Sequence, residues 1–239
     1  KRIEKQVHYS KPIKIMFPDW VAESDSMDEW HMLNPLYEKG AMWVWEEPEE
    51  GEEYILSADV AAGMGDGGDN SAFHVFKLKT MTQVAEFYSD IVPPHVFAQI
   101  INNTGRWYND ALVVVESLND GLSVINKLLF QLYYDHVFHE QKGSKERPGI
   151  KTEKTNRPLF LEALQTALIH EQITINSPRI VRELKTFEYS KLRKRPEARK
   201  GKHDDLIMAL AILLFIRNSF TQNIPVDAKS LIETSDITK

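Results

Sequence analysis

Carboxylate side chains stand at the edges of long apolar runs at three places in the chain. These places are Asp59 after Tyr54–Ala58, Glu116 after Ala111–Val115, and the pair Asp204 and Asp205 before Leu206–Leu214. A charged side chain at the edge of a core needs a partner, because its removal from water costs several kcal/mol. Converging carboxylates suit a hard divalent cation such as Mg²⁺ or Mn²⁺, which binds oxygen ligands. Two acids at strand ends and one at a helix start is the layout of a two-metal site that cleaves phosphodiesters.

Each of these acids also has a simpler explanation. Asp59 could cap a turn, and Glu116 could pair with a nearby Lys or Arg. One acid of the pair Asp204 and Asp205 could complement the dipole of the helix that follows. Adjacent helical residues point about 100° apart, so only one member of this pair faces a shared site. For Glu116, which closes a run of valines, we favour metal ligation.

The glycine-rich loop Gly63–Asp69 offers weaker candidates. It lacks the Gly-Lys-Ser/Thr of a phosphate-binding loop and the twelfth-position glutamate of an EF-hand. Turn preferences explain Asp66. Asp69 lies just before the expected strand 71–78 and could orient a metal ligand from there. His203 is a candidate contact to water or phosphate. The chain has no cysteine and no Gly-x-Ser-x-Gly elbow, so covalent catalysis is poorly supported.

The chain has 239 residues and a formal net charge of −6, but its charge is unevenly distributed. Residues 185–202 hold eight basic side chains against two acidic ones, a local charge of +6, whereas residues 46–53 are strongly acidic. A basic segment beside the third carboxylate site suggests a surface for phosphate groups, although the segment taken alone slightly favours a solvated loop. The candidate DNA-binding residues are Lys154, Arg157, Lys191, Arg193, Lys194, Arg195, Arg199, Lys200 and Lys202.

The order of expected elements predicts an α/β fold. Three strands come first, and then helices alternate with shorter strands. An antiparallel meander followed by crossover connections gives a mixed central sheet flanked by helices. The expected strands are 41–45, 54–59, 71–78, 83–88, 111–116, 137–138 and 173–175, and the expected helices are 27–39, 94–108, 119–134, 158–170, 177–187 and 203–220. Residues 142–157 are expected to be a loop, and 190–202 a loop or hairpin.

We divide the chain into three parts by composition. Residues 1–50 have no clear period and are expected to be an attachment segment or linker, residues 51–220 the main domain, and residues 221–239 a loose tail. The first residues show no secretory signal, and the longest apolar run, 206–216, is too short to cross a bilayer.

Four segments together resemble a known family. They are Tyr54–Gly63, Asp69–Phe73, Val115–Gly121 and His203–Leu210, with the His-Asp-Asp-Leu-x-Met-Ala pattern of the last the most specific. Lys154–Pro158 adds a Lys-Thr-x-Arg-Pro segment that opens a helix. The combination is similar to the nuclease domain of the large terminase subunit of tailed bacteriophages, over roughly residues 40–220.

The resemblance implies a ribonuclease H-like endonuclease that cuts double-stranded viral DNA during genome packaging. Asp59, Glu116 and Asp205 would ligate two Mg²⁺ or Mn²⁺ ions, with Asp204, Asp69 and His203 in support. The implied partners are DNA, an ATPase domain, the portal protein and the small terminase subunit, in the host cytoplasm. No Walker A motif is present, so we expect no ATP site in this chain.

Two alternatives remain open at this stage. A related ribonuclease H-like resolvase or transposase would prefer branched DNA. A non-catalytic docking module would use its carboxylates only in salt bridges, and would gain no thermal stability from Mn²⁺.

Overall fold

The computed structural model describes residues 10–16, 42–62, 69–142, 144–190 and 195–222, and its centre is a six-stranded mixed sheet. The strand order is β1-β2-β5-β4-β3-β6. These strands are β1 (Lys14–Met16), β2 (Met42–Val44), β3 (Tyr54–Asp59), β4 (Ser71–Lys77), β5 (Thr82–Ser89) and β6 (Leu112–Val115). The expected mixed sheet is therefore confirmed.

The sheet has the expected meander followed by a crossover. β3, β4 and β5 pair antiparallel in chain order, and β6 then pairs parallel with β3. The helix α3 (Pro94–Trp107) forms the connection between β5 and β6. The parallel pair brings the carboxyl ends of β3 and β6 to the same edge of the sheet.

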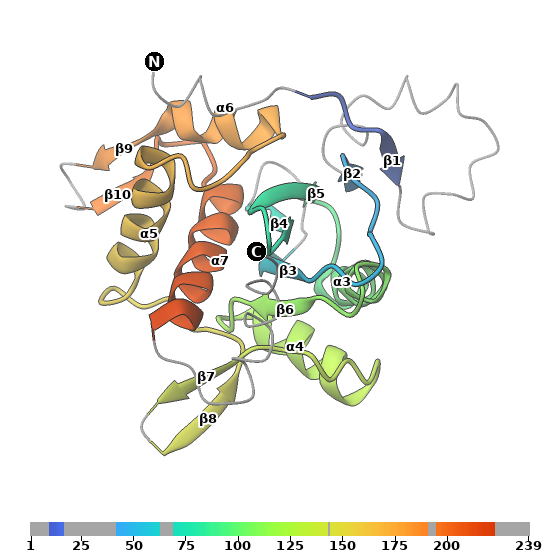
Figure 1. Cartoon of the computed structure of the whole chain (residues 1–239). Coiled ribbons are helices and arrows are strands. Elements are labelled where there is room, and N and C mark those ends of the chain that lie inside the picture. The colour runs from blue at the N-terminus through green and yellow to red at the C-terminus, as the bar shows by residue number, and fades with distance from the viewer. Residues whose placement is uncertain (1–9, 17–41, 63–68, 143, 191–194, 223–239) are drawn as a thin grey trace.

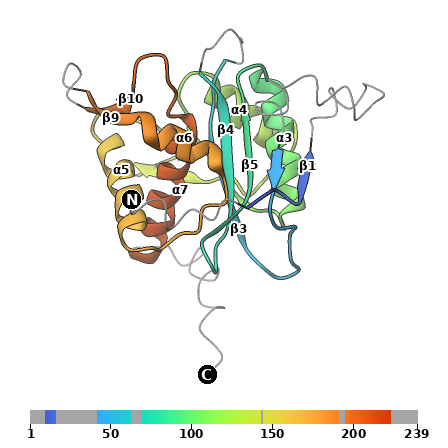
Figure 2. The same ribbon diagram turned by 90° about the horizontal axis from the view of Figure 1, so that it is seen from above.

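Helices cover both faces of the sheet (Figures 1 and 2). On one face lie α3 and α4 (Asp120–Phe130), and on the other lie α5 (Arg157–Ile169), α6 (Pro178–Thr186) and α7 (Asp205–Gln222). Along β3, Ile55 packs into the core beneath α5 and α7, whereas Leu56 packs into the core beneath α3 and α4. Burial on both faces explains why β3 and β6 are apolar without alternation.

α7 is the most deeply buried helix of the described chain. Its residues from Leu206 to Leu214 are all buried, and it packs against α5, β3 and β4. A helix surrounded by protein needs no polar face, which accounts for its uniformly apolar sequence. Among the residues that the structure describes, no helix has the length and apolar character needed to cross a membrane.

Two local expectations were wrong. Residues 142–157 were expected to be a loop, but β7 (His139–Lys142) and β8 (Lys145–Pro148) form an antiparallel hairpin that projects from the body (Figure 1). Its charged residues show no apolar alternation, so the pattern did not reveal strands. The helix expected to reach Tyr134 ends at Phe130, because Tyr134 turns back into the core and its hydroxyl donates to the Ala111 carbonyl at 2.6 Å.

Further elements differ from the expectation in type or in extent. The segments 137–138 and 173–175 form single bridges, Val113 with Val137 and Thr82 with Thr174, rather than strands. The basic segment forms a hairpin of β9 (Phe187–Ser190) and β10 (Arg195–Ala198). The expected helix 27–39 lies outside the described residues. β2, within the expected attachment segment, pairs with β5 in the central sheet, and the division at residue 50 stays a prediction.

Candidate functional site

Asp59 and Glu116 lie side by side at the edge of the sheet. Ala58 is in register with Val115 in the parallel pair, and the Glu116 amide donates to the Ala58 carbonyl at 3.0 Å. Asp59 is the last residue of β3, and Glu116 directly follows β6. Because parallel strands end at the same edge, the register alone brings these two carboxyl groups together.

The two carboxyl groups share an unfavourable electrostatic environment. Burial, and then the charge of Glu116 and a hydrogen bond shared with it, raise the pKa of Asp59 well above its ordinary value. The charges of Asp205 and Asp204 add to this increase. Within the described part of the chain, no Lys, Arg or His pairs with Asp59 or Glu116. The salt-bridge explanation considered for Glu116 therefore has no support among the described residues.

Asp205 is the third acid of the group and the first residue of α7. Its Oδ2 accepts two hydrogen bonds from Asn70, one from the backbone amide and one from Nδ2, each at 2.9 Å. Burial raises the pKa of Asp205 to about 6, although these two hydrogen bonds oppose the increase. Asn70 directly precedes β4, whose residue Ala72 is paired with Asp59, so β4 links the two acids.

Asp204 and Asp205 differ in their partners, as the helix geometry predicted. Arg157, the first residue of α5, donates from Nη2 to the Asp204 Oδ2 at 2.6 Å. Arg157 was expected to hold DNA, but its side chain is only 18% exposed and its charge is directed at Asp204. This arginine therefore compensates one acid of the pair.

The two supporting residues lie near Asp205 without contacting it closely. The His203 Nδ1 is 3.8 Å from the Asp205 Oδ2 and 3.9 Å from the Asp69 Oδ1, both beyond hydrogen-bonding distance. Asp69 is 87% exposed, and Asp66 lies outside the described residues. The His203 Nδ1 is buried and has no hydrogen-bond partner in the described structure.

One buried acid, Glu183 of α6, was missed by sequence reasoning. Its Oε2 accepts a hydrogen bond from the Ile207 amide at 3.1 Å, in the first turn of α7. Burial, and then the charge of Asp205, raise the pKa of Glu183 to about 9. The available signal was positional: Glu183 lies three residues after the buried Ile180, where a core-facing helix places an apolar residue.

The candidate DNA-binding residues differ in their exposure and in their ion pairs. Lys154, Lys200 and Lys202 are exposed, whereas Arg195 pairs with Glu197 at 3.0 Å and Arg199 pairs with Glu188 at 2.8 Å. Lys191, Arg193 and Lys194 lie outside the described residues. The two acids of this segment thus compensate part of its positive charge.

The donor set fits a hard divalent cation by its chemistry. Carboxylate oxygens are the preferred ligands of Mg²⁺ and Mn²⁺, and Asp59 and Glu116 have no cationic partner among the described residues. The side chains do not stand in a ready ligand geometry, because no three His, Asp or Glu residues in the described ranges are grouped closely enough to hold an ion.

No family model matches this sequence, but solved structures share its fold. The large terminase nuclease of the thermophilic phage G20c with bound magnesium has a TM-score of 0.60 and 18% identity, covering 74% of this chain and 87% of that chain. The same nuclease with bound cobalt has a TM-score of 0.61 and 19% identity over the same shares. The nuclease domain of Thermus phage P74-26 has a TM-score of 0.56 and 19% identity, covering 73% of this chain and 84% of that chain.

The chain has the large terminase nuclease fold. This result confirms the expected α/β class with a mixed central sheet flanked by helices, and it confirms the family resemblance at the level of the fold. In this chain, the acids at the ends of β3 and β6 and at the start of α7 come from three separate parts of the sequence.

Proposed function

We propose that this chain is a metal-dependent endonuclease that cuts double-stranded viral DNA during genome packaging. The observation that carries the proposal is the pair Asp59 and Glu116, two carboxyl groups held together by strand register without a cationic partner among the described residues. Asp205 adds a third acid whose charge acts on Asp59. The terminase nuclease fold supports the same assignment.

In the proposed site, Asp59, Glu116 and Asp205 supply the oxygen ligands, with Asp204 beside them. Bound Mg²⁺ or Mn²⁺ ions, two by resemblance, would supply water activation and stabilise the leaving 3′ oxygen. Asn70 fixes one oxygen of Asp205 by two hydrogen bonds, and Arg157 fixes Asp204. The role of these residues is to orient the carboxylates before a cation arrives, as partners of metal ligands do.

The exposed basic residues would hold the DNA backbone. Lys154, Lys200 and Lys202 are free of the ion pairs that occupy Arg195 and Arg199 in the described structure. Phosphate contacts carry little sequence information, so cutting is expected to depend weakly on sequence. His203 and Asp69 would act beside Asp205 as supporting groups, on a surface that remains accessible at Asp69.

The wider assignment follows from the same proposal. Residues 51–220 would form the nuclease unit, residues 1–50 an attachment to an ATPase domain, and residues 221–239 a tail. The portal protein and the small terminase subunit would be the partners in the motor, and the host cytoplasm the place of action. The strand β2 would then be shared between the attachment segment and the nuclease sheet.

Plasmid nicking tests the proposal. Supercoiled plasmid is incubated with the protein and Mn²⁺, Mg²⁺ or a chelator, and relaxed and linear products are measured. Cleavage with metal and none with chelator is the expected result. A strong preference for a four-way junction over linear duplex would instead favour a resolvase. Absence of both cleavage and thermal stabilisation by Mn²⁺ would favour a docking module.

A further inference from the structure

The first turn of α7 is held by side chains from two other elements. The ring Nε2 of His74, on β4, lies 3.0 Å from the Leu206 carbonyl oxygen. The Glu183 Oε2, on α6, accepts from the Ile207 amide at 3.1 Å. Both side chains are buried, and α6 lies beside the beginning of α7 (Figure 1).

The hydrogen bond made by Glu183 replaces a cap that Asp204 would normally supply. The Met208 amide donates to the Asp204 carbonyl at 2.8 Å, which makes Asp204 the N-cap residue and Ile207 the third residue of the helix. An aspartate at an N-cap usually accepts with its side chain from the amide of the second or third residue. Here the Asp204 carboxylate binds Arg157 instead, and Glu183 takes the Ile207 amide.

A buried network fixes the helix that carries Glu183. Arg179 lies one turn earlier on the same face of α6, and its Nε donates to the Glu86 Oε1 at 2.6 Å. Its guanidinium lies 4.1 Å from the centre of the Trp43 ring. The Ser177 hydroxyl caps α6 by accepting from the Arg179 amide, and it donates to the same Glu86 oxygen at 2.7 Å. α6 is thus anchored to β5, and Glu183 reaches α7 from a fixed support.

We propose that Glu183 is a positioning residue that caps α7 in place of Asp204. The cap leaves the carboxylates of Asp204 and Asp205 free from the backbone of their own helix, and the charges of both act on Asp59. The assignment of a metal to that site rests on the proposed function. Only the Oε2 of Glu183 takes part in the cap. The Oε1 is buried and has no hydrogen-bond partner in the described structure.

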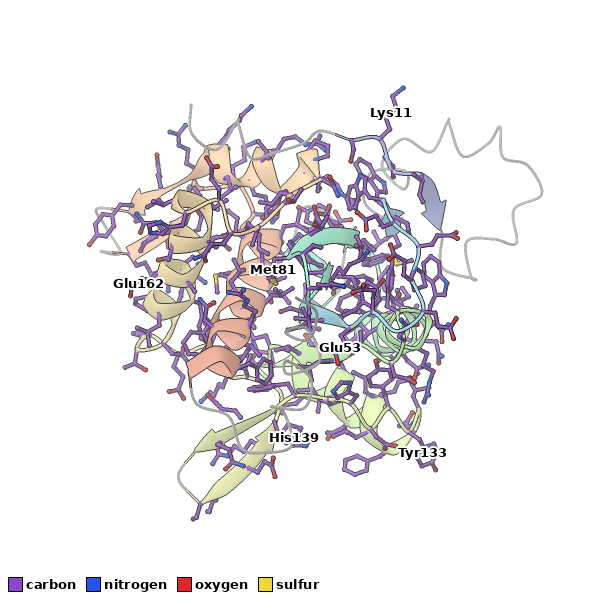
Figure 3. The ribbon with its side chains drawn as sticks, viewed as in Figure 1. Lys11, Glu53, Met81, Tyr133, His139 and Glu162 are labelled. Carbon is purple, nitrogen blue, oxygen red and sulfur yellow. The ribbon has the colours of Figure 1, made fainter. Side chains whose placement is uncertain are left out.

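Two substitutions separate the cap from simple packing. Glu183→Met fills similar space without an oxygen acceptor, whereas Glu183→Gln keeps an oxygen that can accept from the Ile207 amide. Val124→Ala, on the buried face of α4, is the control for reduced stability away from α7. Glu162→Ala is the surface control, on the outer side of α5 (Figure 3).

The first readout is amide hydrogen exchange of Ile207, without metal. Exchange is expected to be faster in Glu183→Met and close to wild type in Glu183→Gln and in both controls. The second readout is Mn²⁺ affinity by titration calorimetry. We expect Glu183→Met to bind Mn²⁺ about tenfold more weakly, in the range found for groups that orient metal ligands, and the other three variants to stay within about twofold.

The two readouts distinguish the possible failures. Wild-type exchange at Ile207 in Glu183→Met would overturn the cap. Faster exchange with unchanged Mn²⁺ affinity would show a structural cap only and overturn the positioning role. If wild type itself binds no Mn²⁺, the proposed function fails and the positioning role with it, while the exchange measurement still decides whether Glu183 caps α7.

Discussion

The Arg157 guanidinium and the Asp204 carboxylate form an ion pair of 2.6 Å that joins the beginnings of two helices. Arg157 opens α5, and Asp204 directly precedes α7. The neighbouring Asp205 has no Lys or Arg partner among the described residues and accepts from the neutral Asn70 instead. Two adjacent acids therefore have different partners: Asp204 is paired with an arginine, whereas Asp205 accepts from an amide and lies 3.8 Å from the His203 Nδ1.

This difference predicts that Asp205→Ala and Asp204→Ala have different effects on DNA cleavage and on the free energy of unfolding. Asp205→Ala is expected to lower DNA cleavage at least about tenfold more than Asp204→Ala, since a carboxylate without an arginine partner is the better ligand. Asp204→Ala is expected to lower the free energy of unfolding by about 1–2 kcal/mol, because it leaves the partly buried Arg157 unpaired. Plasmid cleavage and urea unfolding of both variants check the prediction. Equal losses of activity, or the reverse order, would contradict the assignment of Asp205 as ligand.

The sequence was most informative where an apolar run allows only one kind of secondary structure. Apolar runs predicted the strands β3 and β6 with an acid at the end of each, and the parallel register of the two strands brings these acids to one edge. The uniformly apolar run after Asp205 predicted the buried helix α7. Fold class and the pair Asp59 and Glu116 were therefore accessible before the structure.

The hydrogen bonds that fix the site were not accessible, because they join residues distant in sequence. Glu183 lies 24 positions from Ile207, and Arg157 lies 47 positions from Asp204. Neither separation in sequence can be predicted from the periodicity of a helix or a strand. The β7–β8 hairpin was missed for a different reason, since it is charged on both faces and has no core to impose alternation. Contacts between residues distant in sequence, rather than local propensity, therefore determine the two hydrogen bonds.

The basic hairpin gives a second prediction. Replacement of Arg193, Lys194 and Arg195 by alanine is expected to weaken DNA binding without changing Mn²⁺ affinity. The slope of log affinity against log salt becomes shallower by roughly 0.9 for each duplex phosphate that the variant no longer neutralises. Lys79→Ala, in the turn after β4 at the far end of the strands from Asp59, is the control. Identical salt slopes for the triple variant and wild type would show that this hairpin does not touch DNA.

The buried His74 gives a prediction about pH. Its Nδ1 lies 2.8 Å from the Gln83 amide nitrogen, which only donates, so this ring nitrogen carries a lone pair. Burial lowers the pKa of His74 below its ordinary value of 6.5, although the charge of Glu86 opposes the decrease. The folded protein therefore keeps His74 neutral at a pH where the unfolded chain already binds a proton.

The sign of the effect follows from this difference. As pH falls below about 6.5, the unfolded state gains the proton first, and wild type loses stability by up to about 1.4 kcal/mol per pH unit. His74→Gln lacks the titrating ring and is expected to lose less between pH 7 and pH 5. Acids with a raised pKa, such as Asp205, change stability in the opposite direction, but both proteins carry them and the difference cancels. Parallel stability curves from urea unfolding would mean that His74 takes up its proton over the same pH range in the folded and unfolded states, which would contradict the lowered pKa.

The most direct test of the metal site is the substitution Asp59→Asn. It removes one charge from the pair with Glu116 and changes little volume, so the fold is expected to persist, with a melting temperature in the absence of metal that equals or exceeds that of wild type. Calorimetric titration with Mn²⁺ and plasmid cleavage are measured on the same preparations. The account predicts that wild type binds Mn²⁺ and cleaves DNA, whereas Asp59→Asn binds Mn²⁺ at least about tenfold more weakly and shows no cleavage. A folded Asp59→Asn protein with full Mn²⁺ affinity and full cleavage would contradict it.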